Sequence, residues 1–182
     1  VQEVNRARDI VRGLLEFSRV KEFSKMSVSL RMLAERSIRL MSCQVPSGID
    51  IVTDIPEDLV LELDPQRMQE VLLNLIENAV HAIGSPPGEI RIAARLDESG
   101  SEAVLEVEDT GPGIEKLAMG RIFDPFFTTK EVGKGTGLGL AITYGIIEQH
   151  GGTIVVENRE PRGARFRIRL PIQRPEREKV SQ

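Results

Sequence analysis

Apolar residues recur every three or four positions in four segments of the chain, which predicts four amphipathic helices. The clearest begins at Asp64-Pro65, where the carboxylate can accept from free backbone N–H groups and proline suits the first helical position. It ends at about Ile83, because residues 84–88 are rich in glycine and proline. Its buried side is predicted to consist of Met68, Val71, Leu72, Leu75, Ile76, Ala79, Val80 and Ile83. The other predicted helices cover residues 4–20, 30–41 and 138–149.

Alternating apolar positions bounded by turn residues predict five strands. Residues 24–27 are interpreted as a short junction, and the glycine-rich stretch 109–137 has no regular period. Along the chain, the predicted helices come first, and the strands that follow are interrupted by one helix. This order indicates an α+β fold in which the helices cover one face of a sheet. The predicted strands cover residues 49–55, 89–96, 103–108, 153–157 and 164–170.

The first predicted helix, residues 4–20, carries an apolar stripe wide enough to need a partner. Gly13 in its middle costs about 1 kcal/mol relative to alanine, so packing has to hold the helix together. Periodicity alone leaves two interpretations open: pairing with another helix, or folding back onto the chain's own domain.

Composition is that of a soluble globular protein, with 40% hydrophobic and 29% charged residues. The formal net charge of −4 gives no reason to expect a nucleic-acid partner. Arginines do cluster near the end of the chain: Arg162 is followed by Arg165, Arg167 and Arg169, which alternate along a predicted strand. A solvated strand face is therefore favoured over a nucleic-acid patch.

The single cysteine, Cys43, cannot form an internal disulfide, which favours a reducing compartment and predicts a cytoplasmic domain. No apolar run approaches the roughly 20 residues that span a bilayer. The chain begins Val1-Gln2-Glu3, with no initiating methionine and no signal-peptide pattern, so we expect a fragment of a longer protein. A membrane anchor upstream in the full-length protein would be compatible with these observations.

Two asparagines and a histidine lie on the polar side of the helix that starts at Pro65. Asn74, Asn78 and His81 are spaced i, i+4 and i+7, within about 60° of one another around the helix axis. Asparagine is a poor helix former, so two of them one turn apart indicate a function for their amide oxygens. Mg²⁺ is often held by only one or two such oxygens. The alternative is a solvated face, which the nearby Glu77 would suit.

A glycine-rich turn follows the strand predicted over residues 103–108. Its sequence is Asp109-Thr110-Gly111-Pro112-Gly113, in which the glycines let the backbone approach a flat ligand. An aspartate at the end of a strand can also accept from an exocyclic amine. The same residues make a good turn with no ligand at all, and that interpretation stays open.

A second glycine-rich segment, residues 133–140, opens the last helix. Free N–H groups at a helix N-terminus make an anion site, and Lys130 and Lys134 add positive charge. The spacing excludes a P-loop, because Gly135 rather than Ser or Thr follows Lys134, and it does not fit G-x-G-x-x-G. A mobile glycine lid remains as the interpretation. Residues 123–130 hold three of the six phenylalanines, which we expect to be anchored or covered by this lid.

Four of these segments resemble, in motif, order and spacing, the ATP-binding domain of sensor histidine kinases, and the resemblance extends from about residue 28 to residue 171. It implies a catalytic domain that transfers the ATP γ-phosphoryl group to a histidine, for relay to a response-regulator aspartate. It also implies a two-layer α/β sandwich, a mixed sheet covered by helices on one face, which is shared with gyrase, MutL and a heat-shock chaperone ATPase. The segments that look like the family's N, G1, F and G2 boxes are residues 74–79, 109–114, 123–130 and 135–140.

The resemblance implies roles in binding ATP and Mg²⁺. Asn78 would coordinate Mg²⁺, Asn74 would support the phosphate side, and Asp109 would accept from the adenine amine, partly through water. The glycines of the G1 box would approach the base, and the G2 box would wrap the phosphates, with Thr136 and Lys130 near the γ-phosphate. The implied ATP-binding residues are Asn74, Asn78, His81, Asp109, Gly111, Gly113, Ile114, Phe127, Lys130, Gly135, Thr136, Gly137, Leu138 and Gly139.

Residues 6–18 resemble the second helix of the family's dimerisation hairpin. The first helix of that hairpin, which carries the phosphate-accepting histidine, is absent from the sequence, and His81 and His150 cannot replace it because both lie inside the ATP-binding domain. The implied partners are the chain's own hairpin, in a homodimer, and a response-regulator receiver domain. The expected hairpin helix, ATP-binding domain and charged tail are residues 1–26, 27–172 and 173–182.

Two other functions stay open beside that of a kinase. ATP hydrolases of the same superfamily place a glutamate general base where this chain has Asn74, and an amide cannot take a proton from water. Transfer to an imidazole needs no such base, so Asn74 favours a kinase. The other alternative is a nucleotide-responsive interaction module without transfer chemistry. His81 stands where many relatives carry lysine or arginine on phosphate, and a surface histidine is an equal interpretation.

Overall fold

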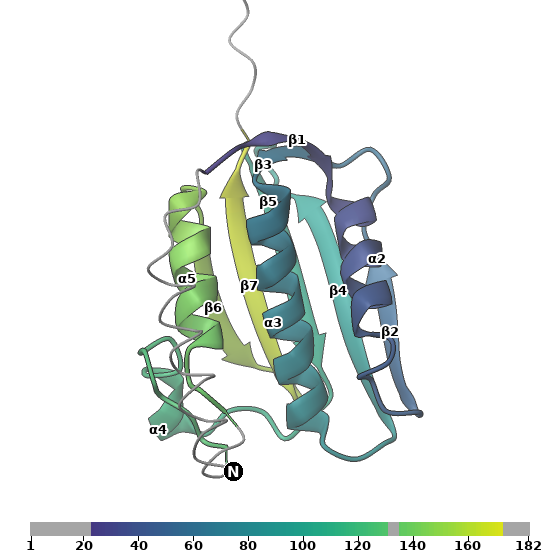
Figure 1. Ribbon diagram of the computed structural model, residues 1–182, viewed down its shortest axis with the longest axis vertical. Helices are drawn as coiled ribbons and strands as arrows, with labels where there is room; N and C mark the ends of the chain where they lie inside the picture. Colours follow the sequence, from purple (N-terminus) through teal and green to yellow (C-terminus); the bar gives the residue numbers. More distant parts are fainter. Residues whose placement is uncertain (1–22, 131–134, 173–182) are drawn as a thin grey trace, which may run out of the picture.

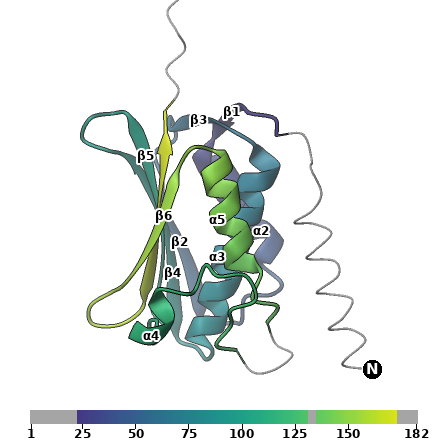
Figure 2. The same cartoon turned by 90° about the vertical axis from the view of Figure 1, so that its left-hand side faces the viewer.

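Strands and helices form two layers in this computed structural model, which describes residues 23–130 and 135–172. In the larger sheet β2 pairs with β4 in parallel and the other neighbours are antiparallel, so the sheet is mixed. Its strand order is β2 (Ile49–Asp54), β4 (Gly88–Leu96), β5 (Glu102–Asp109), β7 (Ala164–Pro171) and β6 (Thr153–Asn158). One face is covered by α2 (Leu30–Met41), α3 (Pro65–Ile83) and α5 (Gly139–Gln149) (Figure 1, Figure 2). The predicted α+β sandwich with helices on one face is confirmed.

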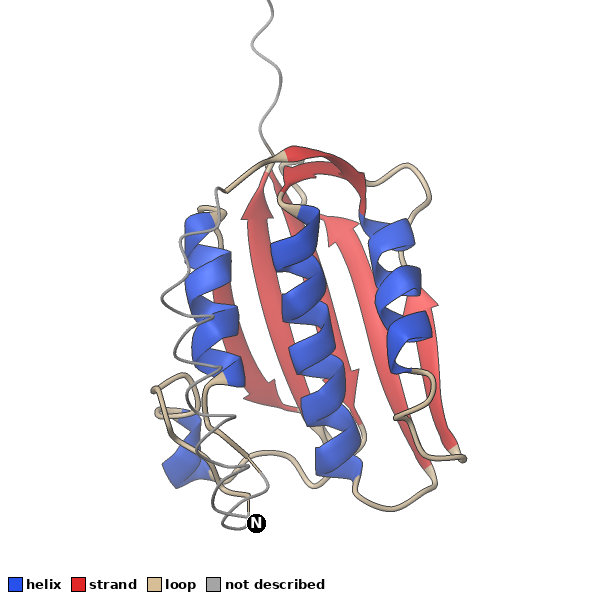
Figure 3. Ribbon diagram, viewed as in Figure 1, coloured by secondary structure: helices blue, strands red, loops and turns tan. Residues whose placement is uncertain are grey.

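Helix α3 lies across the middle of the sheet, between α2 and α5 (Figure 3). It starts as the sequence predicts, because Oδ1 of Asp64 accepts from the amides of Gln66 (3.0 Å) and Arg67 (3.1 Å). Removing such a cap costs about 1 kcal/mol. The polar side that carries Asn74 and Asn78 faces α5 and a loop instead of the sheet. The buried side includes Met68, Val71, Leu72, Leu75, Ile76 and Ala79.

A second, two-stranded sheet was not predicted. It pairs β1 (Met26–Ser29) with β3 (Val60–Leu63) antiparallel, and β1 begins inside residues 24–27, the segment interpreted as a junction. Each strand has four residues, too few for an alternation of polar and apolar positions to be recognised. A one-turn helix, α4 (Lys116–Met119), is likewise unexpected in the stretch that has no regular period.

The sheet face away from the helices carries a ladder of cross-strand ion pairs. On β7, Arg165 pairs with Glu108 and Glu157, and Arg167 pairs with Glu106 (2.7 Å) and Glu157 (3.1 Å). These arginines alternate away from the core as predicted, but the face is not simply solvated, because Glu106 and Glu108 are buried beneath them. Burial would raise the pKa of Glu106, but hydrogen bonds from its arginine partners bring that pKa below its usual value. The arginines are thus held in intramolecular pairs.

Some predictions fall on residues that the structure does not describe. The helix predicted over residues 4–20 and the charged tail 173–182 lie outside the described residues, as do Gly133 and Lys134 of the glycine-rich segment. The division of the chain at residues 26 and 172 stays a prediction. Between residues 23 and 172, apart from the undescribed 131–134, no helix is long and apolar enough to cross a bilayer.

Candidate nucleotide site

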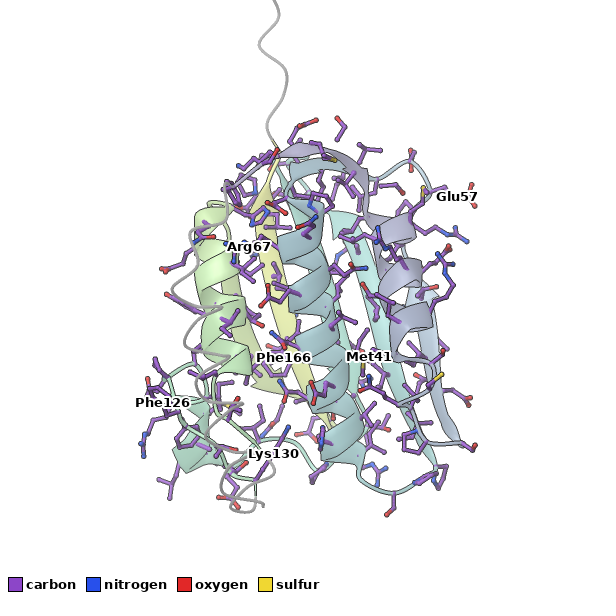
Figure 4. The ribbon with its side chains drawn as sticks, in the orientation of Figure 1. Met41, Glu57, Arg67, Phe126, Lys130 and Phe166 are labelled. Carbon is purple, nitrogen blue, oxygen red and sulfur yellow. The ribbon has the colours of Figure 1, made fainter. Side chains whose placement is uncertain are left out.

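Three successive turns of α3 each touch a different segment of the chain. Nδ2 of Asn74 donates to the carbonyl of the first residue of α5 (3.2 Å). One turn on, Oδ1 of Asn78 accepts from Nζ of Lys130 (3.3 Å), which lies beside the C-terminal half of α3 (Figure 4). After another turn, the Ala82 carbonyl lies so close to Gly111 that an added Cβ there would be 3.0 Å from it. The other three predicted motif segments therefore meet along one side of α3, which carries the fourth, although they are far apart in the sequence.

Asp109, the last residue of β5, is a buried carboxylate with one oxygen already bonded. Its Oδ1 accepts from the amides of Gly111 (2.8 Å) and Ala164 (3.3 Å). Oδ2 makes no hydrogen bond to any residue that the structure describes, so Oδ2 is the oxygen that can accept from a ligand. Burial raises the pKa of Asp109, and the two amides and the charge of Arg159 oppose that rise.

The hairpin between β6 and β7 holds the loop that follows Asp109. Asn158, the last residue of β6, accepts from the Ile114 amide through Oδ1 and donates to the Ile114 carbonyl through Nδ2, both at 2.8 Å. Nη1 of Arg159 donates to the Asp109 carbonyl (3.2 Å). The two hydrogen bonds of Asn158 to Ile114 form a clamp, and Gly113 lies against it, beside Oδ1 of Asn158. Asn158 and Arg159 were not predicted as site residues, because contacts between residues 44 and 50 positions apart leave no local signal.

The start of α5 lies opposite Asn74 and has the character of an anion site. Leu138, the N-cap residue, supplies no side-chain cap, while its own amide donates to Oγ1 of Thr136 (3.3 Å). The first amides of the helix are thus open to a ligand. Gly135, at the other end of the segment, lies against Thr128 and Lys130.

Oδ1 of Asn78 already faces a cation, the ammonium of Lys130. Burial lowers the pKa of Lys130, and the nearby carboxylate of Glu77 opposes that shift. An amide oxygen that accepts from a positive group also suits a hard cation such as Mg²⁺. Within the part of the chain that the structure describes, no group of three or more His, Cys, Asp or Glu side chains could hold a metal ion. Among the residues of this site, Asn78 thus offers an amide oxygen to which a cation could bind.

The phenylalanine segment is bonded to the glycine-rich segment that was predicted as a lid, and the two together, residues 121–130 and 135–138, are called the lid from here on. The amide of Phe126 donates to the carbonyl of Gly137 (2.9 Å), which joins the phenylalanine segment to the glycine segment. Phe123 and Phe127 are partly buried against the core. Phe126 is instead 54% exposed and lies at the edge of the molecule (Figure 4). The predicted anchoring of these phenylalanines holds for two of the three.

His81 stands outside this network of contacts. Its side chain is exposed, and Nδ1 lies 2.7 Å from the carbonyl of Glu77, one turn back on the same helix. Among the described residues, no hydrogen bond joins His81 to the lid or to the loop after Asp109. The ring leaves Nε2 as the nitrogen that could meet a ligand.

Comparisons with known proteins identify the family to which the chain belongs. Residues 63–174 match the family model described as histidine kinase-, DNA gyrase B-, and HSP90-like ATPase. The sensor histidine kinase ZraS of Escherichia coli O157:H7 is 39% identical over 176 residues, which cover 94% of this chain and 37% of ZraS. The chain thus spans little more than a third of that relative's length.

Solved structures share the fold. The catalytic domain of the histidine kinase ThkA, in a nucleotide-free form, aligns with a TM-score of 0.73 and 36% identity, covering 84% of this chain and 97% of that one. The histidine kinase ThkA in complex with the response regulator protein TrrA aligns with a TM-score of 0.76 and 33% identity, over 94% of this chain and 48% of that one. With a family match over more than half of its length, the chain belongs to the histidine kinase-, DNA gyrase B- and HSP90-like ATPase family, among its histidine kinase catalytic domains.

Proposed function

We propose that this chain binds ATP with Mg²⁺ as the catalytic domain of a sensor histidine kinase, and that it transfers the γ-phosphoryl group to a histidine of its dimerisation hairpin. The observation that carries the proposal is the row of contacts along α3. There Asn74, Asn78 and Ala82 meet the start of α5, the lid and the loop after Asp109. A nucleotide needs these surfaces side by side: one for the base, one for the phosphates and one for the metal.

The base would lie against the loop that follows Asp109. Oδ2 of Asp109 would accept from the exocyclic amine of adenine, partly through water, because Oδ1 already accepts from two backbone amides. Gly111, Gly113 and Ile114 would form the surface beside the ring. A base that presents a carbonyl at this position would face the carboxylate with a second acceptor, so the proposal includes a preference for adenine.

The phosphates would lie between α3 and the start of α5. Backbone N–H groups of residues 135–139 would bind phosphate oxygens, and Asn74 would hold that segment through its bond to Gly139. Asn78 would hold Mg²⁺, which neutralises charge on the phosphates when it is bound. Lys130 would then move from Asn78 to the γ-phosphate.

Three further residues would border the phosphate chain. Thr136 lies in the segment that would wrap the phosphates, where its Oγ1 already accepts from the Leu138 amide. Phe127, partly buried, would hold the lid against the core, and the guanidinium of Arg121 lies 4.7 Å from the centre of its ring. His81 would contribute only through Nε2, because Nδ1 faces its own helix.

Asn74 favours transfer to an imidazole over hydrolysis. A carboxamide cannot accept a proton from water, and Nδ2 of Asn74 already donates to the Gly139 carbonyl. An imidazole acceptor brings its own lone pair, so the domain has only to position and stabilise the transferring group. In that step the new nitrogen–phosphorus bond forms as the bond between the γ-phosphorus and the bridging oxygen breaks, and ADP leaves with that electron pair.

The partners are proposed from the relatives. ThkA has been solved in complex with the response regulator protein TrrA, which supports a receiver domain as the next phosphate acceptor here. Because the chain spans 37% of the length of ZraS, we assign the acceptor histidine and the rest of a homodimeric hairpin to the remainder of the natural protein. The proposal places the domain in the cytoplasm, where ATP is available.

Transfer of label from γ-labelled ATP to a separately supplied hairpin that bears the histidine tests this function. With Mg²⁺ the hairpin should acquire label that is labile to acid and stable to alkali. The chain alone should acquire none, because His81 and His150 lie inside the nucleotide domain. Label on the chain alone, or an unlabelled hairpin beside a chain that demonstrably binds ATP, would contradict the proposal.

A further inference from the structure

Asn158 lies outside the four motif segments, yet it contacts the loop proposed to face the base. Its carboxamide satisfies both backbone groups of Ile114, accepting from the amide and donating to the carbonyl, each at 2.8 Å. A side chain that bonds both groups of one residue replaces the strand partner that this residue lacks. Asn158 can do so because it ends the edge strand β6, next to the end of β5 across β7.

The same hairpin also holds the beginning of that loop. Nη1 of Arg159 donates to the Asp109 carbonyl (3.2 Å), and its Nη2 pairs with the buried Glu108 (3.3 Å). The Ala164 amide donates to Oδ1 of Asp109 (3.3 Å). Both ends of the loop, residues 109–114, are therefore bonded to the β6–β7 hairpin. The segments that would hold the phosphates are bonded elsewhere, because Lys130 and the start of α5 are bonded to α3.

We propose that Asn158 is a positioning residue for the nucleotide base. Resting on the proposed function, the inference is that the Asn158 clamp on Ile114 fixes the glycine-containing loop and so sets the position of Asp109 relative to adenine. Without the clamp, the Ile114 amide and carbonyl turn to water and the loop occupies further conformations. The apparent affinity for the nucleotide then falls in proportion to the fraction of time that the loop spends in its binding conformation. Among the described residues, the side-chain hydrogen bonds of Asn158 go to Ile114 and none goes to the segments that would hold the phosphates, so the loss is confined to the base.

The test compares two nucleotides in each variant by calorimetry with Mg²⁺: ADP, and inosine diphosphate, in which a carbonyl replaces the exocyclic amine. Asn158→Ala should weaken ADP binding roughly tenfold, the value of one to two hydrogen bonds, and weaken inosine diphosphate binding much less. The ratio of the two affinities should therefore fall. Asn158→Asp, which keeps the volume and the acceptor but has no donor for the Ile114 carbonyl, should give an intermediate ratio.

The matched control is Arg162→Gln, at the exposed tip of the same hairpin, which should leave the ratio unchanged. Equal weakening of both nucleotides by Asn158→Ala would show a merely structural role and overturn the inference, as would an unchanged affinity for ADP. Because the ratio is measured within one variant, a lowered melting temperature does not alter it, and Asn158→Asp replaces any alanine variant that fails to fold. A wild-type chain that binds neither nucleotide overturns the proposed function itself.

Discussion

Gly163, in the turn between β6 and β7, has the least room for a side chain among the described glycines. Its φ is +106°, a conformation that L residues rarely adopt, and an added Cβ would lie 1.9 Å from the carbonyl oxygen of Asp109. A close carbon–oxygen contact is about 3.3 Å, so roughly 1.4 Å would have to be recovered by moving backbone. The atoms that the new Cβ would meet belong to the backbone of Asp109 and Thr110, so no flexible side chain can turn aside. Gly163→Ala therefore has to displace Asp109 or the hairpin.

The magnitude follows from two terms. An L residue in a left-handed conformation costs about 1–2 kcal/mol, and overpacking against a fixed neighbour costs about 1–3 kcal/mol more. The free energy of unfolding of Gly163→Ala should therefore fall by about 2–5 kcal/mol, within the stability of a typical domain. The displaced Asp109 should also weaken ADP binding.

Gly100→Ala is the matched control for this substitution. Gly100 also has a positive φ, +66°, but an added Cβ would meet nothing within 4 Å, so this variant carries the conformational term alone. Urea denaturation should place Gly163→Ala at least about 1 kcal/mol below Gly100→Ala, and only Gly163→Ala should lose affinity for ADP. Equal stabilities for the two variants, or wild-type ADP affinity in Gly163→Ala, would refute the close approach to Asp109.

The carboxylate of Asp109 and the imidazole of His150 each give a prediction about the effect of pH. Asp109→Asn should weaken ADP binding at least tenfold, the value of a hydrogen bond to a charged acceptor. Because burial raises the pKa of Asp109, the affinity of the wild type for ADP should begin to fall at a higher pH than it would if this aspartate were exposed. A variant with the same pH profile as the wild type would contradict this. Burial lowers the pKa of His150, whose Nε2 accepts from the Asp64 amide (3.0 Å), so the folded chain binds fewer protons than the unfolded one. The free energy of unfolding should therefore decrease as the pH drops below about 6.5, and His150→Gln should remove much of that slope in denaturation measured across this range; an unchanged slope would count against it.

Long periodic segments could be predicted from the sequence, and short ones could not. The helix predicted over residues 30–41 coincides with α2, and Asp64 marks the start of α3, because apolar spacing and a capping residue are local signals. β1 and β3 have four residues each and are specified by their pairing with one another, which leaves no periodic trace in either segment.

The candidate site could be predicted as a set of segments but not as a set of contacts. Glycine content, asparagine spacing and the resemblance to histidine kinases indicated which residues to consider. The pairing of Lys130 with Asn78 joins residues 52 positions apart, and the clamp of Asn158 on Ile114 depends on the sheet order β5-β7-β6. Sheet order is set by tertiary packing, so neither contact can be read from one sequence.

Calorimetric titration of ATP into the wild-type chain and into Asn78→Ala, each with and without Mg²⁺, tests the proposed site most directly. We expect Mg²⁺ to tighten ATP binding to the wild type. We expect Asn78→Ala to weaken Mg²⁺-ATP binding roughly tenfold, the value of one good polar contact to a charged group, and to weaken metal-free ATP binding much less. Equal losses with and without the metal, or no heat from the wild type at millimolar ATP, would contradict a site in which Asn78 holds Mg²⁺ on the phosphates.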